Sequence, residues 1–277
     1  MRIRATVAAV SGALALSSLA VPAAHATGTS GTPYTLNVSF SNVTIAGAIK
    51  VGSTNKVSTT YSYTLTHGSD VDITASDFYT DAFLYKGSYD TETTELYGDN
   101  PATCTATSST TATCTGTVDI YPTDPDPKSA DAGTWGVAAE AVAFNGQDQQ
   151  NPSDLSKVGY KDQGGLGSTL VQRYSKLTVD AGPEPIAKGK TLTVTGKLSR
   201  ANWDDNQYHG YTNQPVKLQF RKYGTTTYTT VKTVYTDSYG NLKTTTTANY
   251  DGYWRFSFAG TSTTPAVNAT GDFVDVQ

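Results

Sequence analysis

The feature that most constrains this chain is an alternation of apolar and polar residues with a period of two. Tyr34, Leu36, Val38 and Phe40 alternate with polar residues, and the run 57–65 repeats the pattern. Successive side chains of a β-strand point to opposite faces, so this alternation predicts strands of a sheet that buries one face. Further runs of the same kind lie at 83–85, 118–120, 135–144, 192–198, 216–220, 229–235, 242–248, 254–258 and 273–276.

Turn-forming residues separate these runs. Glycine supplies the positive φ that tight turns need at Asp237–Asn241 and Asn249–Gly252. The chain contains 47 threonines and 18 tyrosines but only one methionine, a composition that favours strands over helices. Short strands with turns every 8–12 residues or so are typical of immunoglobulin-like sandwiches. We therefore expect an all-β fold with two tandem immunoglobulin-like β-sandwich domains after a cleaved signal peptide.

Residues 1–26 have the composition of a secretory signal. Arg2 and Arg4 give a positive start, and the apolar stretch 7–21 that follows is too short to span a membrane. Ala24 and Ala26 fit the small-residue cleavage site. We expect a secreted, extracellular protein with no membrane span after cleavage of the signal peptide.

The 251 residues after position 26 suit two domains. We place the N-terminal β-sandwich domain at 27–172 and the C-terminal immunoglobulin-like domain at 173–277. After signal removal, 18 Lys and Arg stand against 24 Asp and Glu, a net charge of −6. An acidic chain without a basic run argues against nucleic acid or anionic lipid as a partner.

Cys104 and Cys114 are the two cysteines of the chain. A close, even pair in an exported protein predicts a disulfide. The residues between them read as two short strands around Ser108 and Ser109, so the bridge would join the strands of a hairpin.

Catalytic motifs are not recognisable in the sequence. His67 and His209 are the histidines outside the signal, one in each domain, and no G-x-S-x-G motif exists. Two separated histidines and a disulfide do not provide the three or four ligands that zinc requires. We therefore expect no enzyme, no catalytic residue and no cofactor; a hydrolase that uses a pair of aspartates stays open as an alternative.

Calcium is the metal that the sequence leaves open. Asp124, Asp126 and Asp131 lie in one short segment, and calcium prefers several oxygen ligands on such a segment. The segment does not match the loop pattern of an EF-hand, and its prolines also fit a plain surface turn. A calcium-binding structural protein of the extracellular matrix or envelope is thus the main alternative function.

An aromatic loop is the strongest candidate for binding. Trp203, Tyr208 and Tyr211 flank a polar run that contains Asp204 and Asp205, between two predicted strands. Loops at the ends of sandwiches commonly bind partners, and flat rings beside carboxylates suit sugars. In the alternative, Trp203 closes the end of the core and the tyrosines cover it.

Three segments of the C-terminal domain carry a resemblance to known modules. Lys190–Leu198, Gln214–Arg221 and Asp251–Phe258 resemble bacterial immunoglobulin-like modules of the carboxypeptidase-regulatory or prealbumin-like kind. The whole chain resembles small exported proteins of actinomycetes such as Streptomyces, some of which are labelled calcium-binding. The resemblance implies a β-sandwich fold and export, and it transfers no site residue.

These observations favour a secreted, non-catalytic protein of binding or adhesion type. We expect it to present its sandwich loops to a cell-surface, cell-wall or polysaccharide partner.

Overall fold

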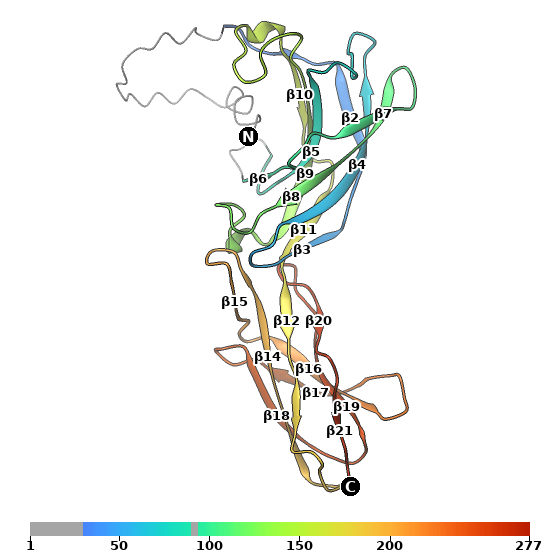
Figure 1. Ribbon diagram of the computed structural model, residues 1–277, viewed down its shortest axis with the longest axis vertical. Coiled ribbons are helices and arrows are strands. Elements are labelled where there is room, and N and C mark those ends of the chain that lie inside the picture. The colour runs from blue at the N-terminus through green and yellow to red at the C-terminus, as the bar shows by residue number, and fades with distance from the viewer. Residues whose placement is uncertain (1–29, 90–93) are drawn as a thin grey trace, which may run out of the picture. The chain divides into compact units, whose positions relative to one another are not determined.

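The computed structural model describes residues 30–89 and 94–277 (Figure 1). The expected signal peptide lies outside these residues. The described chain contains 21 strands and two short 3-10 helices, η1 (Ser129–Asp131) and η2 (Leu155–Lys157), and no α-helix. The expected all-β fold is thereby confirmed. In the same residues, no helix has the length and apolar character to cross a membrane.

The chain divides into two compact units. Of the described residues, the N-terminal unit contains those in 30–47, 58–120 and 135–169, and the C-terminal unit contains 48–57, 121–134 and 170–277. The division expected from sequence, at 172/173, placed 48–57 and 121–134 with the N-terminal domain. In the structure these two segments hydrogen bond to a turn of the C-terminal unit more than 70 residues away in the chain.

Two sheets make up the N-terminal unit. One has the order β2-β4-β8-β7, and the other runs from β1 through β10 and β9 to β5 and β6. This is the immunoglobulin arrangement, in which a sheet of the A, B, E and D strands faces a sheet of the G, F and C strands. The strands are β1 (Tyr34–Thr35), β2 (Val38–Ile45), β4 (Val57–His67), β5 (Phe78–Tyr85), β6 (Glu95–Leu96), β7 (Thr103–Ala106), β8 (Thr111–Ile120), β9 (Gly133–Ala143) and β10 (Gly159–Gln163).

Side-chain hydrogen bonds join the two sheets of the N-terminal unit. The hydroxyls of Tyr63 and Thr80 lie 2.7 Å apart, and the Tyr61 hydroxyl donates to Asp81 at 3.2 Å. Both tyrosines point from β4 toward β5, as the alternation along 57–65 predicts. Burial raises the pKa of Tyr63 far above its ordinary value, so its hydroxyl stays protonated within the core.

The predicted disulfide is confirmed. Cys104 on β7 and Cys114 on β8 are directly paired across the hairpin, with their Cα atoms 4.0 Å apart. The hairpin closes at 107–111, where the Thr107 amide donates to the Thr111 carbonyl at 2.8 Å. The bridge therefore joins the two strands that form the edge of the first sheet.

Replacing both cysteines with serine should lower the free energy of unfolding of the N-terminal unit by about 2–3 kcal/mol, because the bridge closes a small loop in the unfolded chain. Urea unfolding of the double variant, compared with the oxidised protein, measures this loss. An unchanged midpoint of unfolding would show that the hairpin needs no bridge.

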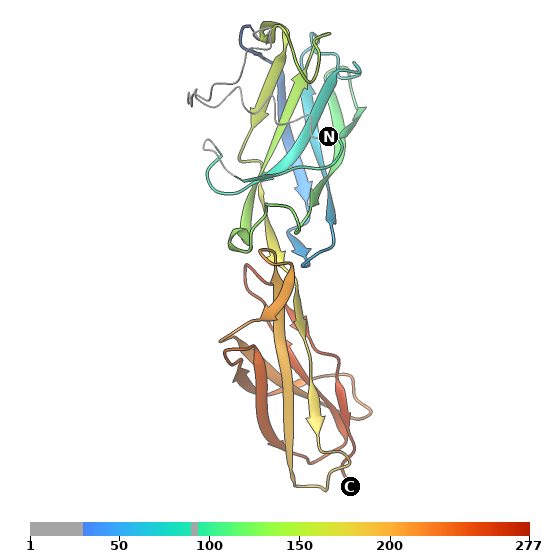
Figure 2. The same cartoon turned by 60° about the vertical axis from the view of Figure 1, so that its left-hand side comes forward.

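The C-terminal unit is also a sandwich, visible in the yellow-to-red part of Figures 1 and 2. One sheet joins β12, β13, β15 and β18 around β14, and the other has the order β17-β16-β19 with β20 and β21 beyond β19. Its strands are β12 (Ser175–Leu177), β13 (Asp180–Gly182), β14 (Thr191–Asn202), β15 (Gln207–Gly210), β16 (Pro215–Lys222), β17 (Thr229–Tyr235), β18 (Asn241–Thr247), β19 (Gly252–Phe258), β20 (Val267–Asn268) and β21 (Asp272–Val274). In addition, β3 (Ala48–Val51) pairs in parallel with residues 170–173 of β11 (Ser168–Arg173).

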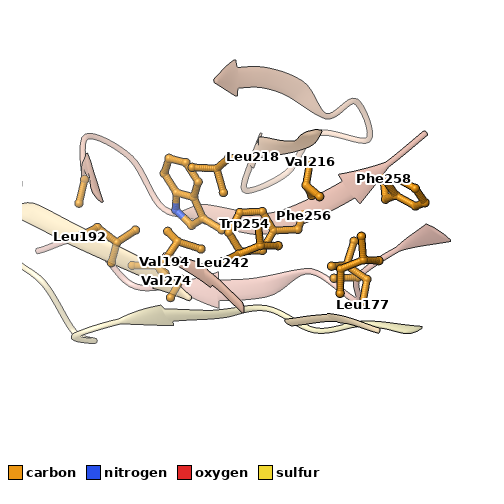
Figure 3. Packing of buried hydrophobic residues seen from close by; sticks show 14 of the residues in the cluster. Leu177, Leu192, Val194, Val216, Leu218, Leu242, Trp254, Phe256, Phe258 and Val274 are labelled. Atoms are coloured by element: carbon orange, nitrogen blue, oxygen red, sulfur yellow. The ribbon is translucent and has the colours of Figure 1, made fainter. Parts of the chain in front are cut away.

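The core of the C-terminal unit lies between these two sheets. Figure 3 shows Leu192, Val194 and Leu242 from one sheet near Trp254 and Phe256 from the other. On β19, buried and half-exposed residues alternate along all seven positions. The strands therefore bury the face that the period-two pattern predicts.

Candidate binding face

Trp203, the expected centre of an aromatic platform, is buried in the turn between β14 and β15. Only 3% of its surface is exposed, and its indole Nε1 donates to the Gly52 carbonyl at 3.0 Å. The turn is held further by Asn206, whose Nδ2 donates to the carbonyls of Ser53 at 3.1 Å and Pro122 at 2.8 Å. Trp203 thus closes this end of the C-terminal unit, and the prediction that it stacks on a sugar was wrong. A buried indole needs a partner for its N–H group, and segment 48–57 supplies one.

The two tyrosines of the same loop are half-buried and carry cations on their rings. The Lys176 ammonium lies 3.6 Å from the ring centre of Tyr208, and the Arg200 guanidinium lies 3.9 Å from that of Tyr211. Tyr211 also packs edge-on against the core residue Phe258 at 5.8 Å. These rings therefore complete the local packing and do not form an open platform.

The carboxylates of this loop are engaged within the turn. Asp204 accepts a hydrogen bond from the Ser129 amide at 3.1 Å. Asp205 accepts from the Gln207 amide and lies 2.6 Å from Nε2 of His209. Both aspartates thus fix the turn that Trp203 anchors.

The expected calcium residues do not form a cluster. Asp131 caps η1 by accepting from the Lys128 amide at 2.8 Å, and Asp126 is exposed to solvent. Across residues 30–89 and 94–277, no three His, Cys, Asp or Glu side chains gather where they could hold a metal ion. The predicted set of Asp124, Asp126 and Asp131 is therefore not assembled among the described residues.

Neither histidine belongs to a nucleophilic dyad. Nδ1 of His67 lies 3.0 Å from the neighbouring Gly68 carbonyl. His209 pairs with Asp205, and no described serine or threonine hydroxyl hydrogen bonds to its ring. A base beside a nucleophile is what hydroxyl-based covalent catalysis needs.

A group of aromatic and cationic side chains instead covers the outer face of the β17-β16-β19-β21 sheet. The strand alternation that buries Trp254 and Phe256 turns Arg221, Tyr253 and Arg255 outward. Strand pairing places Arg221 opposite Tyr253, and Tyr253 opposite Phe273 on β21. Three strands thus contribute to one row of side chains across the sheet.

Tyr228, from the connection between β16 and β17, completes a stack over this row. The Arg221 guanidinium lies 4.1 Å from the ring centre of Tyr253 and 5.4 Å from that of Tyr228. The Arg255 guanidinium lies 3.8 Å from the ring centre of Tyr228. We call Arg221, Tyr228, Tyr253, Arg255 and Phe273 the tyrosine–arginine face.

Hydrogen bonds fix the two guanidinium groups of this face. Nη1 of Arg221 donates to the Thr225 carbonyl at 2.6 Å, and Nε of Arg255 donates to Oε1 of Gln219 at 2.9 Å. Neither arginine makes an ion pair with a carboxylate of the described chain. The face therefore presents oriented positive charge that no carboxylate neutralises.

Exposed aromatic rings continue the tyrosine–arginine face at its edge. Phe273 is 36% exposed, and Tyr223, which is 63% exposed, lies 5.8 Å from it edge-on. Tyrosine, phenylalanine and arginine are enriched at protein interfaces because they combine apolar area with directional polar groups. This composition makes the face a candidate surface for binding.

This face lies on strands, whereas the binding residues expected from the sequence lie in a loop. The available signal lay in the strands. Most outward positions of the strands carry threonine or serine, whereas those of β16 and β19 carry Lys217, Arg221, Tyr253 and Arg255. Only the pairing of β16 with β19 shows that these residues are neighbours.

Charge is divided unequally between the two units. The C-terminal unit contains 15 Lys and Arg against 11 Asp and Glu, whereas the N-terminal unit from Thr27 onward contains 3 against 13. The net charges are therefore +4 and −10. The acidic charge of the whole chain therefore does not describe the C-terminal unit, although no basic run occurs in its sequence either.

The chain matches no protein-family model and no curated protein sequence. Solved structures that are similar to it at low identity include two bacterial adhesins and a set of titin domains. The Yersinia pseudotuberculosis adhesin InvE is 14% identical with a TM-score of 0.26, and the match covers 86% of this chain and 60% of that chain. The Escherichia coli adhesin FdeC is 11% identical with a TM-score of 0.32, over 89% of this chain and 66% of that chain.

A structure of titin domains is 8% identical with a TM-score of 0.23, and the match covers 87% of this chain and 67% of that chain. The chain thus spans less than two thirds of either adhesin structure. The resemblance to exported actinomycete proteins stays a prediction.

Proposed function

We propose that this protein is a secreted, non-catalytic protein of binding or adhesion type, which contacts a cell-surface, cell-wall or polysaccharide partner through the tyrosine–arginine face. The observation that carries this proposal is the row of Arg221, Tyr253 and Phe273 across three strands of one sheet. The contact surface would thus lie on a sheet, and not on the sandwich loops that the sequence favours.

The geometry of the face supports contact with an extended partner. Its side chains lie on a sheet surface, where rows of residues from neighbouring strands are about 4.8 Å apart. Stacking and hydrogen bonding hold the arginines in place before any partner arrives, which reduces the entropy lost on binding. Preorganised arginines and aromatic rings are the groups that most often dominate binding energy.

The disulfide supports an extracellular location. Cys104 and Cys114 are bonded, and such bonds form and persist in oxidising compartments. The sequence of residues 1–26, with its positive start and A-x-A site, supports export.

Retention on insoluble cell-wall material and insoluble polysaccharides tests the proposal. We expect the protein to be retained on at least one of them, and Tyr253→Ala to weaken binding at least about 10-fold, because truncating a central interface residue costs more than about 1.4 kcal/mol. Tyr239→Ala is the matched control, since Tyr239 is 72% exposed in a turn outside the face.

Two results would contradict the proposal. One is that no material retains the protein, and the other is that Tyr239→Ala weakens retention as much as Tyr253→Ala. Equal melting temperatures of the two variants would establish that the comparison reports binding.

A further inference from the structure

We infer that the tyrosine–arginine face binds an acidic polysaccharide, whose carboxylate groups pair with its arginines. This inference rests on the proposed function and adds the charge class of the ligand.

No carboxylate of the described chain forms an ion pair with the cations of this face. Lys217 shares the outer side of β16 with Arg221. None of Lys217, Arg221 and Arg255 makes an ion pair with a described carboxylate. A face with several unneutralised cations attracts polyanions.

The nearby aspartates bond to backbone amides instead. Asp272, on β21, accepts from the Ala181 amide at 2.7 Å, and Asp251, just before β19, accepts from the Val276 amide at 2.9 Å. These bonds hold loop and strand ends together. The positive charge of the face is therefore left for an external anion.

The stacking of the guanidinium groups on tyrosine rings favours a carboxylate as the anion. The guanidinium groups of Arg221 and Arg255 both lie near the ring of Tyr228, and that of Arg221 also lies over the ring of Tyr253. Guanidinium groups stacked on rings keep the N–H groups at their edges available for carboxylates. Nucleic-acid bases need open ring faces for stacking, and the central rings of Tyr228 and Tyr253 already carry guanidinium groups.

Polar residues lie on the same side of the sheet as the two arginines. Ser257 lies opposite Lys217, and Gln219 lies opposite Arg255. Gln219 holds Arg255 in place, and the Ser257 hydroxyl suits the hydroxyls of a sugar chain, while Phe273 and Tyr223 offer apolar contact at the edge. Charge, hydroxyl partners and apolar rings together fit a sugar polymer that bears carboxylates.

A second copy of this chain is the competing partner, because its N-terminal unit is strongly acidic. At least three of those carboxylates are engaged inside the unit, however. Asp81 accepts from the Tyr61 hydroxyl, Asp162 from the Tyr89 hydroxyl, and Asp119 from three donors. An acidic glycan, whose carboxylates are free, is therefore the better match.

Binding of the full protein to polygalacturonate tests the inference, with fully methyl-esterified polygalacturonate as the neutral comparison. We expect binding to the acid form to be at least about 10-fold tighter, and to weaken about 10-fold or more between low and high salt because exposed charges are screened. Arg221→Gln with Arg255→Gln should weaken binding to the acid form at least about 10-fold.

The matched control is Lys197→Gln with Lys243→Gln, which removes two exposed positive charges from the other sheet of the same unit. We expect this pair to change binding by less than about 2-fold, because salt screens exposed charges that lie far from the bound ligand. Thermal melts of both double variants establish that each is folded.

The other possible results of these binding experiments distinguish the inference from its alternatives. Equal binding to the acid and the ester overturns the inference and leaves the proposed function standing, whereas retention on no glycan and no wall material overturns both. Salt-sensitive self-association lost in the Arg221→Gln, Arg255→Gln variant, without glycan binding, would assign the face to a second copy. Equally tight binding of single-stranded DNA would overturn the choice of a sugar polymer.

Discussion

Replacing Trp203 with alanine should lower the free energy of unfolding of the C-terminal unit by about 3–5 kcal/mol. The indole is almost fully buried, and its N–H donates to the Gly52 carbonyl. The variant loses the packing of a large ring and leaves that carbonyl without its donor. Urea unfolding followed by circular dichroism measures the loss, and the melting temperature should fall by more than about 10 °C.

Two further variants separate the causes of this loss. Trp203→Phe keeps most of the apolar volume but lacks the donor, so it should cost about half as much or less. Tyr239→Ala removes an exposed ring and should change stability by less than about 0.5 kcal/mol. A Trp203→Ala variant as stable as Tyr239→Ala would contradict the role of this turn as the closure of the unit.

Replacing Asp119 with alanine should lower the free energy of unfolding of the N-terminal unit by about 2–4 kcal/mol. This carboxylate is buried at the end of β8 and accepts from the Asp99 amide at 2.8 Å and from Thr117 Oγ1 at 3.0 Å. Ser58 Oγ also donates to it. The alanine variant would leave these three donors without their acceptor.

The conservative variant Asp119→Asn provides the control. It keeps one acceptor oxygen at the same position and should therefore cost less than Asp119→Ala. Equal losses for the two variants would show that charge, and not the number of accepted hydrogen bonds, sets the stability contribution. Chemical unfolding of both proteins at the same pH makes the comparison.

The strands could be predicted from the sequence because their period is a local property. The alternation along 57–65 and 254–258 is a direct consequence of which side chains face the core, and no distant contact is needed to interpret it. The disulfide between Cys104 and Cys114 was predictable for the same reason, since both cysteines belong to one hairpin.

The partners of Trp203 could not be predicted in this way. Gly52 lies 151 residues away in the chain, and nothing in 48–57 indicates that its carbonyls meet an indole. The sequence offers the same aromatic loop whether it is exposed or buried. The choice depends on two segments that leave the N-terminal half of the chain to join the C-terminal unit.

The tyrosine–arginine face was hidden for a related reason. Arg221 and Tyr253 are 32 positions apart and meet through the register of β16 and β19, while Tyr228 arrives from a connection. Alternation shows that Arg221, Tyr253 and Arg255 point away from the core, but it does not show which of them are neighbours. The opposite charges of the two units were similarly masked by the acidic total of the chain.

The location of the binding surface can be measured directly by NMR chemical-shift mapping of the full protein with a short oligogalacturonate. We predict that the largest changes fall on the guanidinium signals of Arg221 and Arg255 and on the ring signals of Tyr253 and Phe273. Changes confined to the Trp203 turn or to the N-terminal unit would contradict the assignment of binding to this sheet.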